Sequence, residues 1–369
     1  MNLKKLGTFA RHEKVLIVAA ICAAISMLAI PPDRSYGKYI DFQVIFILFC
    51  LMAIVAGFQE CGVFRILAQK LLTGKRRLGT VNLALTLMPF LTSMFITNDV
   101  ALITFVPFTI FIFETLHRKR EMIRIIVLQT IAANLGSMAT PVGNPQNLFL
   151  FSHYGLTASE FFPVILPITG ISLAILLPAA QIGARGCAEV TFDRTEKVRR
   201  PRLLALCLCL FLLCLFSVFG ILDYRILVAV VAISLFFAER TLLLRVDYAL
   251  LFTFICFFIF SGNLGAMPTI ESALRSLMDR NALIASAVAS QIISNVPAAV
   301  LLAPLTENWH DLLLGVDIGG LGTPVASLAS LISLKLYLRT EGACPGRYMV
   351  AFTAANALGL ALLLPLAAI

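Results

Sequence analysis

Two aspartates stand inside apolar stretches of the chain, where an ionised side chain is costly. Asp99 lies in the stretch 78–117, and Asp317 lies in the stretch 309–336. A carboxylate within a membrane segment marks a candidate functional site, because hydrocarbon does not solvate its charge. We expect each aspartate to bind a cation or to carry a proton. The structural alternatives are an Asx turn at a hairpin tip for Asp99 and a protonated or locally paired acid for Asp317.

Uncharged polar residues precede or accompany these aspartates in a pattern that occurs twice. Ser93-x4-Asn98-x8-Pro107 has the same spacing as Ser290-x4-Asn295-x8-Pro304. Amide and hydroxyl groups offer oxygens to a cation and hydrogen-bond donors to an anion. Helix-to-helix hydrogen bonding or capping of a turn is the alternative use of these groups. The candidate substrate-binding residues here, which are also candidate sodium ligands, are Thr97, Asn98, Ser294 and Asn295.

A second matched pair of stretches predicts interruptions in the helices that follow. Asn134-Leu-Gly136-x3-Thr140-Pro141-Val142 has the spacing of Asp317-Ile-Gly319-x3-Thr323-Pro324-Val325. Proline removes a helix donor and glycine weakens a helix, so each stretch should unwind. The freed carbonyl oxygens suit a cation, and the freed N–H groups suit an anion. A proline kink with packing glycines is the alternative for one stretch alone, and the repetition favours the break. The predicted helix breaks are at Gly136, Pro141, Pro145, Gly319, Gly320 and Pro324. Further candidates for binding the substrate are Asn144, Asn147 and Thr323. Further candidates for binding the cation or carrying the proton are Asn134, Thr140, Gly143 and Gly322.

The composition predicts a membrane protein that crosses the bilayer many times. Hydrophobic residues make up 60% of the 369 residues and charged residues only 13%, against about 25% in soluble domains. The net charge of +9 is spread over short loops between apolar stretches, so it does not indicate a nucleic-acid partner. The expected partners are the lipid bilayer and a small substrate.

The Lys and Arg residues set the expected topology through the positive-inside bias. Stretch 78–117 begins and ends beside basic clusters and therefore enters and leaves on one side, either as a re-entrant hairpin or as two full crossings. We place the N-terminus in the cytoplasm and the C-terminus outside, in a prokaryotic cytoplasmic membrane. The apolar stretches are 15–30, 42–64, 78–117, 123–152, 157–184, 203–221, 226–238, 246–266, 283–305, 309–336 and 346–368.

The predicted fold class is an all-α polytopic membrane protein with an inverted-topology repeat. The first half, 1–184, contains a hairpin over 78–117 and a broken helix over 123–152. A cytoplasmic linker over 185–202 follows. The second half, 203–369, contains a hairpin over 283–305 that enters from the opposite face and a broken helix over 309–336. Each half thus has a re-entrant helical hairpin and an unwound transmembrane helix.

The hairpin-tip and break motifs together resemble those of the ion transporter superfamily of divalent anion/sodium symporters, citrate transporters and arsenite permeases. The resemblance is carried by 97–100, 139–147, 294–297 and 319–324. It implies a scaffold domain, a transport domain that moves like an elevator, and a homodimer. It further implies two ion sites around one anion. The first site would use Thr97, Asn98, Thr140, Gly143 and Asn147, and the second would use Ser294, Asn295, Gly322 and Thr323.

The tip sequences Thr97-Asn98-Asp99 and Ser294-Asn295-Val296 depart from the Ser-Asn-Thr tip of the dicarboxylate branch, and Asp99 bears on the substrate and the coupling ion. A fixed negative charge at a tip repels a dianion unless a proton or cation neutralises it. We therefore expect a secondary active transporter of a small carboxylate or inorganic oxyanion, coupled to sodium or protons, with no other cofactor. The alternative is an arsenite/antimonite efflux permease or a sodium/proton antiporter that uses both aspartates. An enzyme is not expected, because no protease or hydrolase motif is present.

Overall fold

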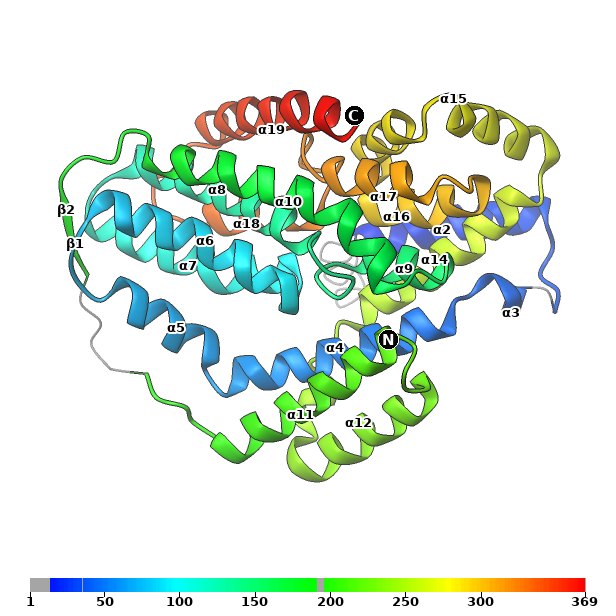
Figure 1. The fold of residues 1–369 in the computed structure, drawn as a ribbon, viewed down its shortest axis with the longest axis horizontal. Coiled ribbons are helices and arrows are strands. Elements are labelled where there is room, and N and C mark those ends of the chain that lie inside the picture. Colours follow the sequence, from blue (N-terminus) through cyan, green and yellow to red (C-terminus); the bar gives the residue numbers. More distant parts are fainter. Residues whose placement is uncertain (1–13, 35, 191–195, 369) are drawn as a thin grey trace, which may run out of the picture.

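The computed structural model describes residues 14–34, 36–190 and 196–368, and helices dominate these residues (Figure 1). Seven of the described helices are long and apolar enough to cross a membrane. The chain is therefore an all-α, multi-pass membrane protein, as predicted. The seven are α4 (Phe42–Glu60), α6 (Leu78–Ile96), α7 (Asn98–Thr115), α10 (Ala158–Gln181), α11 (Pro201–Val218), α14 (Tyr248–Gly265) and α19 (Pro345–Ala367). The other helices are α2 (Lys14–Ala29), α3 (Tyr36–Tyr39), α5 (Val63–Leu72), α8 (Lys119–Ser137), α9 (Pro145–His153), α12 (Tyr224–Glu239), α13 (Thr241–Leu244), α15 (Pro268–Ile293), α16 (Asn295–Leu302), α17 (Trp309–Ile318), α18 (Leu328–Tyr337) and the 3-10 helix η1 (Ala303–Leu305).

Capping residues explain where helices α4 and α14 begin. Asp41 caps α4 by accepting a 3.0 Å bond from the backbone N–H of Val44. Asp247 caps α14 in the same way, from Leu250 at 2.9 Å. An N-cap carboxylate satisfies a backbone donor that the helix leaves free. Both helices are apolar around their whole circumference, which suits contact with protein on one side and lipid on the other.

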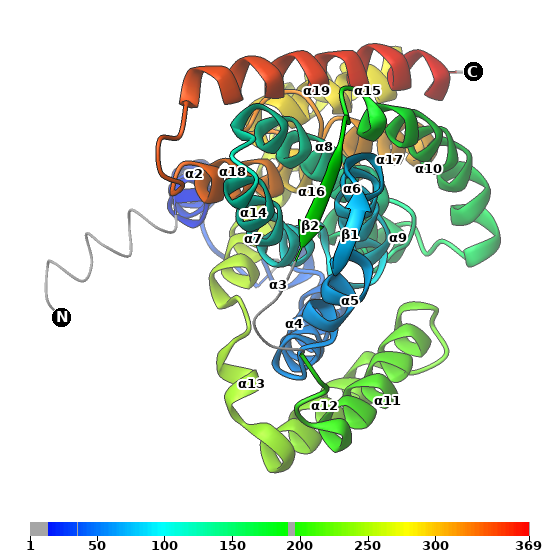
Figure 2. The ribbon, with the colours of Figure 1, turned by 90° about the vertical axis from the view of Figure 1, so that its left-hand side faces the viewer.

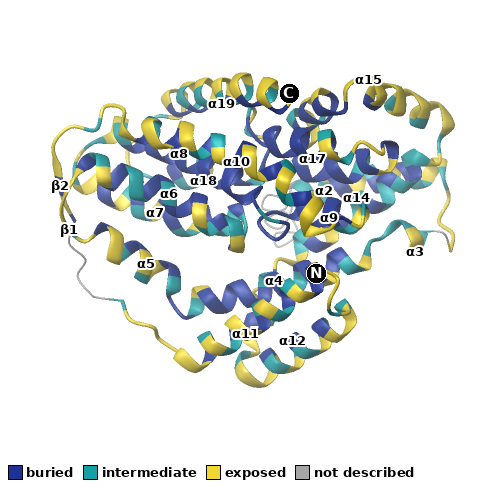
Figure 3. Cartoon of the chain, in the orientation of Figure 1, coloured by how far each residue is buried: buried dark blue, intermediate teal, exposed yellow. Residues whose placement is uncertain are grey.

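The helices form two packed groups, and α14 contacts both of them, through α4 and through α16 (Figure 1). In one group α4 packs on α11 and α12, and α2 packs on α14. In the other group α6, α7 and α8 pack together with α10, α18 and α19. The second hairpin and α17 join this second group, and α16 also contacts α14. Figure 3 shows that α17 and the region around α9 are largely buried, whereas α19 has an exposed outer face.

Two helical hairpins lie where the sequence predicts them. Helices α6 and α7 meet at Thr97, and α15 and α16 meet at Ser294. Both tip residues take the same uncommon backbone conformation, with φ 70° and ψ 150° at Thr97 and φ 76° and ψ 153° at Ser294. Left-handed φ values are rare for residues with a side chain, so their recurrence at matched positions marks a shared turn geometry.

The second hairpin begins differently from the expected stretch 283–305. Helix α15 starts at Pro268, and Asn281 interrupts it with φ −166° and ψ 94°. The Asn281 side chain accepts a 2.8 Å bond from the backbone N–H of Ile284 and so acts as a cap for the hairpin arm. The preceding turns are charged, with an Arg275–Glu271 ion pair at 3.0 Å, which is why hydropathy alone does not include them.

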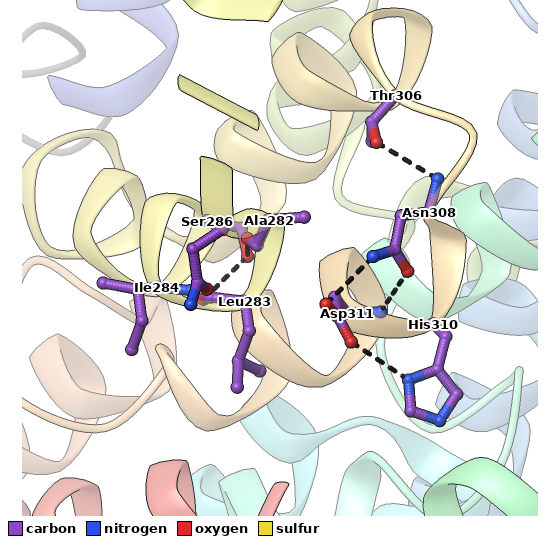
Figure 4. Close-up of polar contacts among 9 residues, drawn as sticks. Ala282, Leu283, Ile284, Ser286, Thr306, Asn308, His310 and Asp311 are labelled. Carbon is purple, nitrogen blue, oxygen red and sulfur yellow. Dashed lines mark hydrogen bonds and ion pairs between the residues drawn. The ribbon is translucent and has the colours of Figure 1, made fainter. Parts of the chain in front are cut away.

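The arm of α15 that follows this interruption packs beside α17 (Figure 4). Ser286 donates to the carbonyl of Ala282 at 2.7 Å within the arm. Asn308 caps α17 by accepting a 3.2 Å bond from the backbone N–H of Asp311. This cap fixes the start of the helix that carries Asp317.

A short antiparallel ribbon, absent from the predicted all-helical fold, lies beside α6. Strand β1 (Gly74–Arg77) pairs with β2 (Cys187–Val190), with Gly74 opposite Val190 and Arg77 opposite Cys187. Figure 2 shows the two strands side by side. The linker predicted over 185–202 therefore contains a strand, and its residues 191–195 lie outside the described part of the chain. The basic run of β1 lacks the apolar alternation that would predict a strand.

Candidate functional site

Both helices that follow the hairpins are interrupted at the matched motifs. The first helix ends at Ser137 and resumes as α9 at Pro145. The second ends at Ile318 and resumes as α18 at Leu328. Of the residues expected to break the helices, Pro141, Gly319, Gly320 and Pro324 lie inside the interruptions, and Pro145 is the first residue of α9. Gly136 does not break its helix, because it lies in the last turn of α8. The side chain of Asn144 caps α9 by accepting a 2.8 Å bond from the backbone N–H of Asn147.

The two interrupted segments exchange hydrogen bonds through residues at equivalent positions. Asn144 Nδ2 donates to Asp317 Oδ1 at 3.1 Å, and Ser327 Oγ donates to Asn134 Oδ1 at 3.0 Å. Asn144 and Ser327 are each ten residues after their own half's Asn134 or Asp317, and each is the N-cap of a resumed helix. All four side chains are at least 95% buried. The interrupted segments of the two halves are therefore hydrogen-bonded to each other through the same two positions in each half.

The first hairpin tip joins this network directly. Asn98 Nδ2 donates to Asn134 Oδ1 at 3.0 Å, and Asn134 Nδ2 donates in turn to the carbonyl of Gly320 at 3.3 Å. The second tip binds backbone instead, because the N–H of Asn295 donates to the carbonyl of Ala326 at 2.9 Å. Ser294 Oγ donates to the same carbonyl at 3.3 Å.

A threonine in each interruption anchors the hairpin of its own half. Thr323 Oγ1 donates to the carbonyl of Gln291 at 3.0 Å, and Thr140 Oγ1 donates to the carbonyl of Met94. Gln291 and Met94 both stand three residues before a tip. The match between the halves thus extends from spacing to a specific side-chain contact.

Close backbone approach requires glycine at Gly136 and Gly319. A Cβ at Gly136 would collide with the backbone of Phe90, and one at Gly319 would come within 2.9 Å of the Cα of Ala287. Phe90 and Ala287 occupy the same position in the two hairpins. The other candidate glycines also sit tightly: Gly143 against Ser137, Gly320 against the Asn295 side chain, and Gly322 (φ 106°) against Gln291.

Asp317 is the carboxylate at the centre of the network. Its Oδ1 accepts from Asn144 Nδ2 and from Gln146 Nε2, both at 3.1 Å, and the residue is 2% exposed. Within the described residues, its Oδ2 is buried and has no hydrogen-bond partner. The same holds for Asn147 Oδ1, whose Nδ2 donates to the carbonyl of Met138 at 2.9 Å. Unpaired buried oxygens are costly and are the type of group that a cation or proton satisfies.

Asp99 stands apart from these contacts. It is half-buried at the start of α7, and its backbone N–H donates to Asn98 Oδ1 at 3.0 Å. Val296, its counterpart, makes the same bond to Asn295 Oδ1 at 2.9 Å. Asp99 Oδ1 is buried without a partner among the described residues, and no hydrogen bond links the Asp99 carboxylate to Asp317 there. The two aspartates therefore do not form a paired carboxylate site.

Gln146, Gln291 and Ser327 belong to the site but were not predicted. Gln291 Nε2 donates to the carbonyls of Gly319 and Leu321 at 2.7 and 2.9 Å. The spacing of the repeat could have identified Ser327, because it matches Asn144. Among the residues described, no group of three or more His, Cys, Asp and Glu side chains could hold a metal ion.

Comparison with known proteins shows similarity to membrane proteins and transporters. The chain is 32% identical over 322 residues to an uncharacterized transporter of Methanocaldococcus jannaschii, covering 87% of this chain and 88% of the relative. It is 32% identical over 345 residues to an inner membrane protein of Escherichia coli, covering 91% of each chain. A 46 kDa membrane protein of Mycobacterium leprae is 26% identical over 374 residues, covering 86% and 85%. The family model for citrate transporters matches residues 8–332, nearly the whole chain. The chain therefore belongs to the citrate transporter family, and it is a membrane transporter, not an enzyme.

Proposed function

We propose that this transporter moves a small carboxylate or inorganic oxyanion by secondary active transport, coupled to sodium or protons. The observation that carries the proposal is the reciprocal exchange of hydrogen bonds between Asn144 and Asp317 and between Ser327 and Asn134. It places two interrupted helices and one hairpin tip in a single buried polar network. Interrupted helices at mid-membrane are where transporters with repeated halves bind substrates and coupling ions.

The cation acts at Asp317 in this proposal. One carboxylate oxygen is held by two amides, whereas the other lacks a hydrogen-bond partner within the described residues. A sodium ion or a proton at Oδ2 neutralises the buried charge. Asn147 Oδ1, which is also buried without a hydrogen-bond partner among the described residues, supplies a second oxygen. An anion then meets a neutral or positive site, which links substrate binding to cation binding.

The anion is held by the donors around the tips and interruptions. Helices α9 and α18 begin at Asn144 and Ser327, and helix N-termini attract negative charge through their free N–H groups. The amides of Asn98 and Asn295 stand at the two tips and add uncharged donors. The family description makes citrate the first substrate to test.

Movement of one helix group past the other completes the proposed cycle. The matched hairpins, tip conformations and threonine anchors support an inverted-topology repeat, in which the two hairpins enter from opposite faces. The group containing both hairpins would then move like an elevator against the group containing α4, α11 and α12. With the basic loops inside, the N-terminus is cytoplasmic and the C-terminus is extracytoplasmic.

Proteoliposome transport tests the proposal. We expect labelled citrate, or another small anion such as succinate or phosphate, to accumulate when an inward sodium or proton gradient is imposed. Asn98→Ala and Asn295→Ala should each abolish accumulation. Transport that survives both substitutions would refute the proposed site. Arsenite or antimonite extrusion driven by a pH gradient alone, or sodium/proton exchange without an anion, would favour the alternative role for Asp99 and Asp317.

A further inference from the structure

Two cavities flank the hairpins at positions that correspond between the halves. The first, about 570 Å³, lies between the end of α4 and helix α7. The second, about 650 Å³, lies between the end of α14 and helix α16. We call them the arginine cavity and the glutamate cavity, after the charged residues that distinguish them. The arginine cavity is lined in part by Arg65, Arg199 and Arg245, and the glutamate cavity is lined in part by Lys38, Asp41 and Glu271.

The hairpin sides of the two cavities are built from equivalent residues. Ile103, Pro107 and Phe108 line the arginine cavity from the first hairpin. Adding the difference in residue number between Asn98 and Asn295 to each of them gives the equivalent position in the second hairpin. The corresponding residues, all of which line the glutamate cavity, are Val300, Pro304 and Leu305.

The scaffold sides also correspond, and here the charge reverses. The N-caps Asp41 and Asp247 align α4 with α14. This alignment matches Gln59 with Gly265 and Arg65 with Glu271, and all four residues line their respective cavities. The same place in the two halves thus carries a cation in one cavity and an anion in the other.

The ion pairs of the arginine cavity leave an excess of positive charge. Arg245 pairs with Glu60 at 2.8 Å, while Arg199 and Arg65 share Glu196 at 3.1 and 3.9 Å. Three arginines therefore face two glutamates. Their side chains are about half exposed, so they remain open to a solute in the cavity. In the glutamate cavity, Asp41 and Glu271 stand against Lys38 and against Arg275, which pairs with Glu271 at 3.0 Å, so this cavity has no excess of positive charge.

We propose that the arginine cavity is the site at which the transported anion binds when the transporter is open to the cytoplasm, and that the corresponding glutamate cavity does not attract anions. This inference rests on the proposed transport of an anion. A cleft with one sign of charge and low-dielectric walls concentrates a solute of the opposite sign. Guanidinium groups suit carboxylates and oxyanions because their N–H groups bind two oxygens at once. The cavity continues along α7 from Thr104, which is within two turns of the tip residue Asn98.

A pair of single-cysteine variants compares the two cavities without relying on transport. Gln59→Cys and Gly265→Cys place thiols at equivalent positions in a background without the nine native cysteines. Gln59 is exposed, and a Cβ at Gly265 meets no atom within 4 Å. The detergent-purified proteins are treated with a sulfonated methanethiosulfonate reagent and with its trimethylammonium analogue. The ratio of the two reaction rates reports the local potential at each thiol.

We expect the anionic-to-cationic rate ratio to be about tenfold higher at Cys introduced for Gln59 than at Cys introduced for Gly265, at low ionic strength. The difference should shrink in high salt, because screening shortens the range of the field. Arg65→Gln should lower the first ratio, and Glu271→Gln should raise the second. Equal ratios at the two positions, or a ratio insensitive to Arg65→Gln, would overturn the proposal.

A second measurement in the natural chain covers the case in which the cysteine-free background fails to fold. Arg65→Gln should raise the KM for citrate entering from the cytoplasmic side several-fold with little change in maximal rate, whereas Glu271→Gln should leave that KM unchanged. A lowered maximal rate with unchanged KM in Arg65→Gln would refute this binding role. Absence of transport of citrate, succinate and phosphate alike by the wild type would count against the proposed function instead, and the thiol reactivities would still decide the cavity's charge.

Discussion

Replacing Asp317 with asparagine should separate the coupling role of this side chain from its structural role. The asparagine Oδ1 can still accept from Asn144 and Gln146, so both amide donors stay paired. The charge and the unpaired carboxylate oxygen are lost. We expect the free energy of unfolding to change by only about 1–2 kcal/mol, since charged acceptors bind more strongly than neutral ones. Asp317→Ala would instead leave two buried amides unpaired, at about 1–3 kcal/mol each, or roughly 2–6 kcal/mol together.

Transport should fail in both variants, although only one is strongly destabilised. Loss of a charge-assisted contact to the cation removes about 1.5–3 kcal/mol, which corresponds to a roughly 10- to 100-fold loss of coupled uptake. The assays are thermal unfolding in detergent and gradient-driven citrate uptake in proteoliposomes. Asp311→Asn is the matched control, because it removes the same charge from an accessible position on the same helix. Wild-type uptake and unchanged cation dependence in Asp317→Asn would refute the reasoning.

The remaining predictions concern the close packing and the tips. Gly136→Ala should lower the unfolding temperature sharply, because its Cβ collides with the Phe90 backbone, whereas Gly170→Ala, which meets no atom within 4 Å, should be neutral or slightly stabilising. Equal unfolding temperatures for these two variants would contradict the packing. Asn98→Ala should cost about 0.5–1.5 kcal/mol of stability, because Asn134 Oδ1 loses one donor and keeps the other, Ser327; an unchanged unfolding curve would count against that contact. A ligand that binds only the native state, at 100 times its Kd, adds about 2.7 kcal/mol of stability. If sodium is the coupling ion, it should therefore raise the melting temperature over choline, and this effect should be lost in Asp317→Asn.

The spacing of polar residues was sufficient to predict the positions of the tips and interruptions. Thr97 and Ser294 are turn residues with the same backbone conformation, and the helices stop at Ser137 and Ile318. These features are local consequences of proline, glycine and polar residues in apolar surroundings, so a pattern along the chain can identify them. The roles of the named residues in binding ions or substrate remain predictions.

Other parts of the site depend on contacts between distant segments. Nothing in the neighbourhood of Gln146 indicates that it bonds Asp317 across 171 residues, because hydropathy and spacing do not specify which interrupted segment faces which. The β1–β2 ribbon was missed because a run of glycine and basic residues has no strand pattern. The first turns of α15 were missed for a related reason, since Glu271 and Arg275 mask an amphipathic helix in a scan for apolar stretches.

Uptake of labelled citrate, succinate, phosphate and arsenite into proteoliposomes, under a sodium gradient, a proton gradient or neither, tests the central claim most directly. We expect at least one of these solutes to accumulate saturably under one cation gradient, and this accumulation to disappear in Asp317→Asn while Asp311→Asn retains it. Flux that is the same with and without either gradient, or accumulation that Asp317→Asn leaves intact, would contradict a cation-coupled anion site at the crossing of the two interrupted helices.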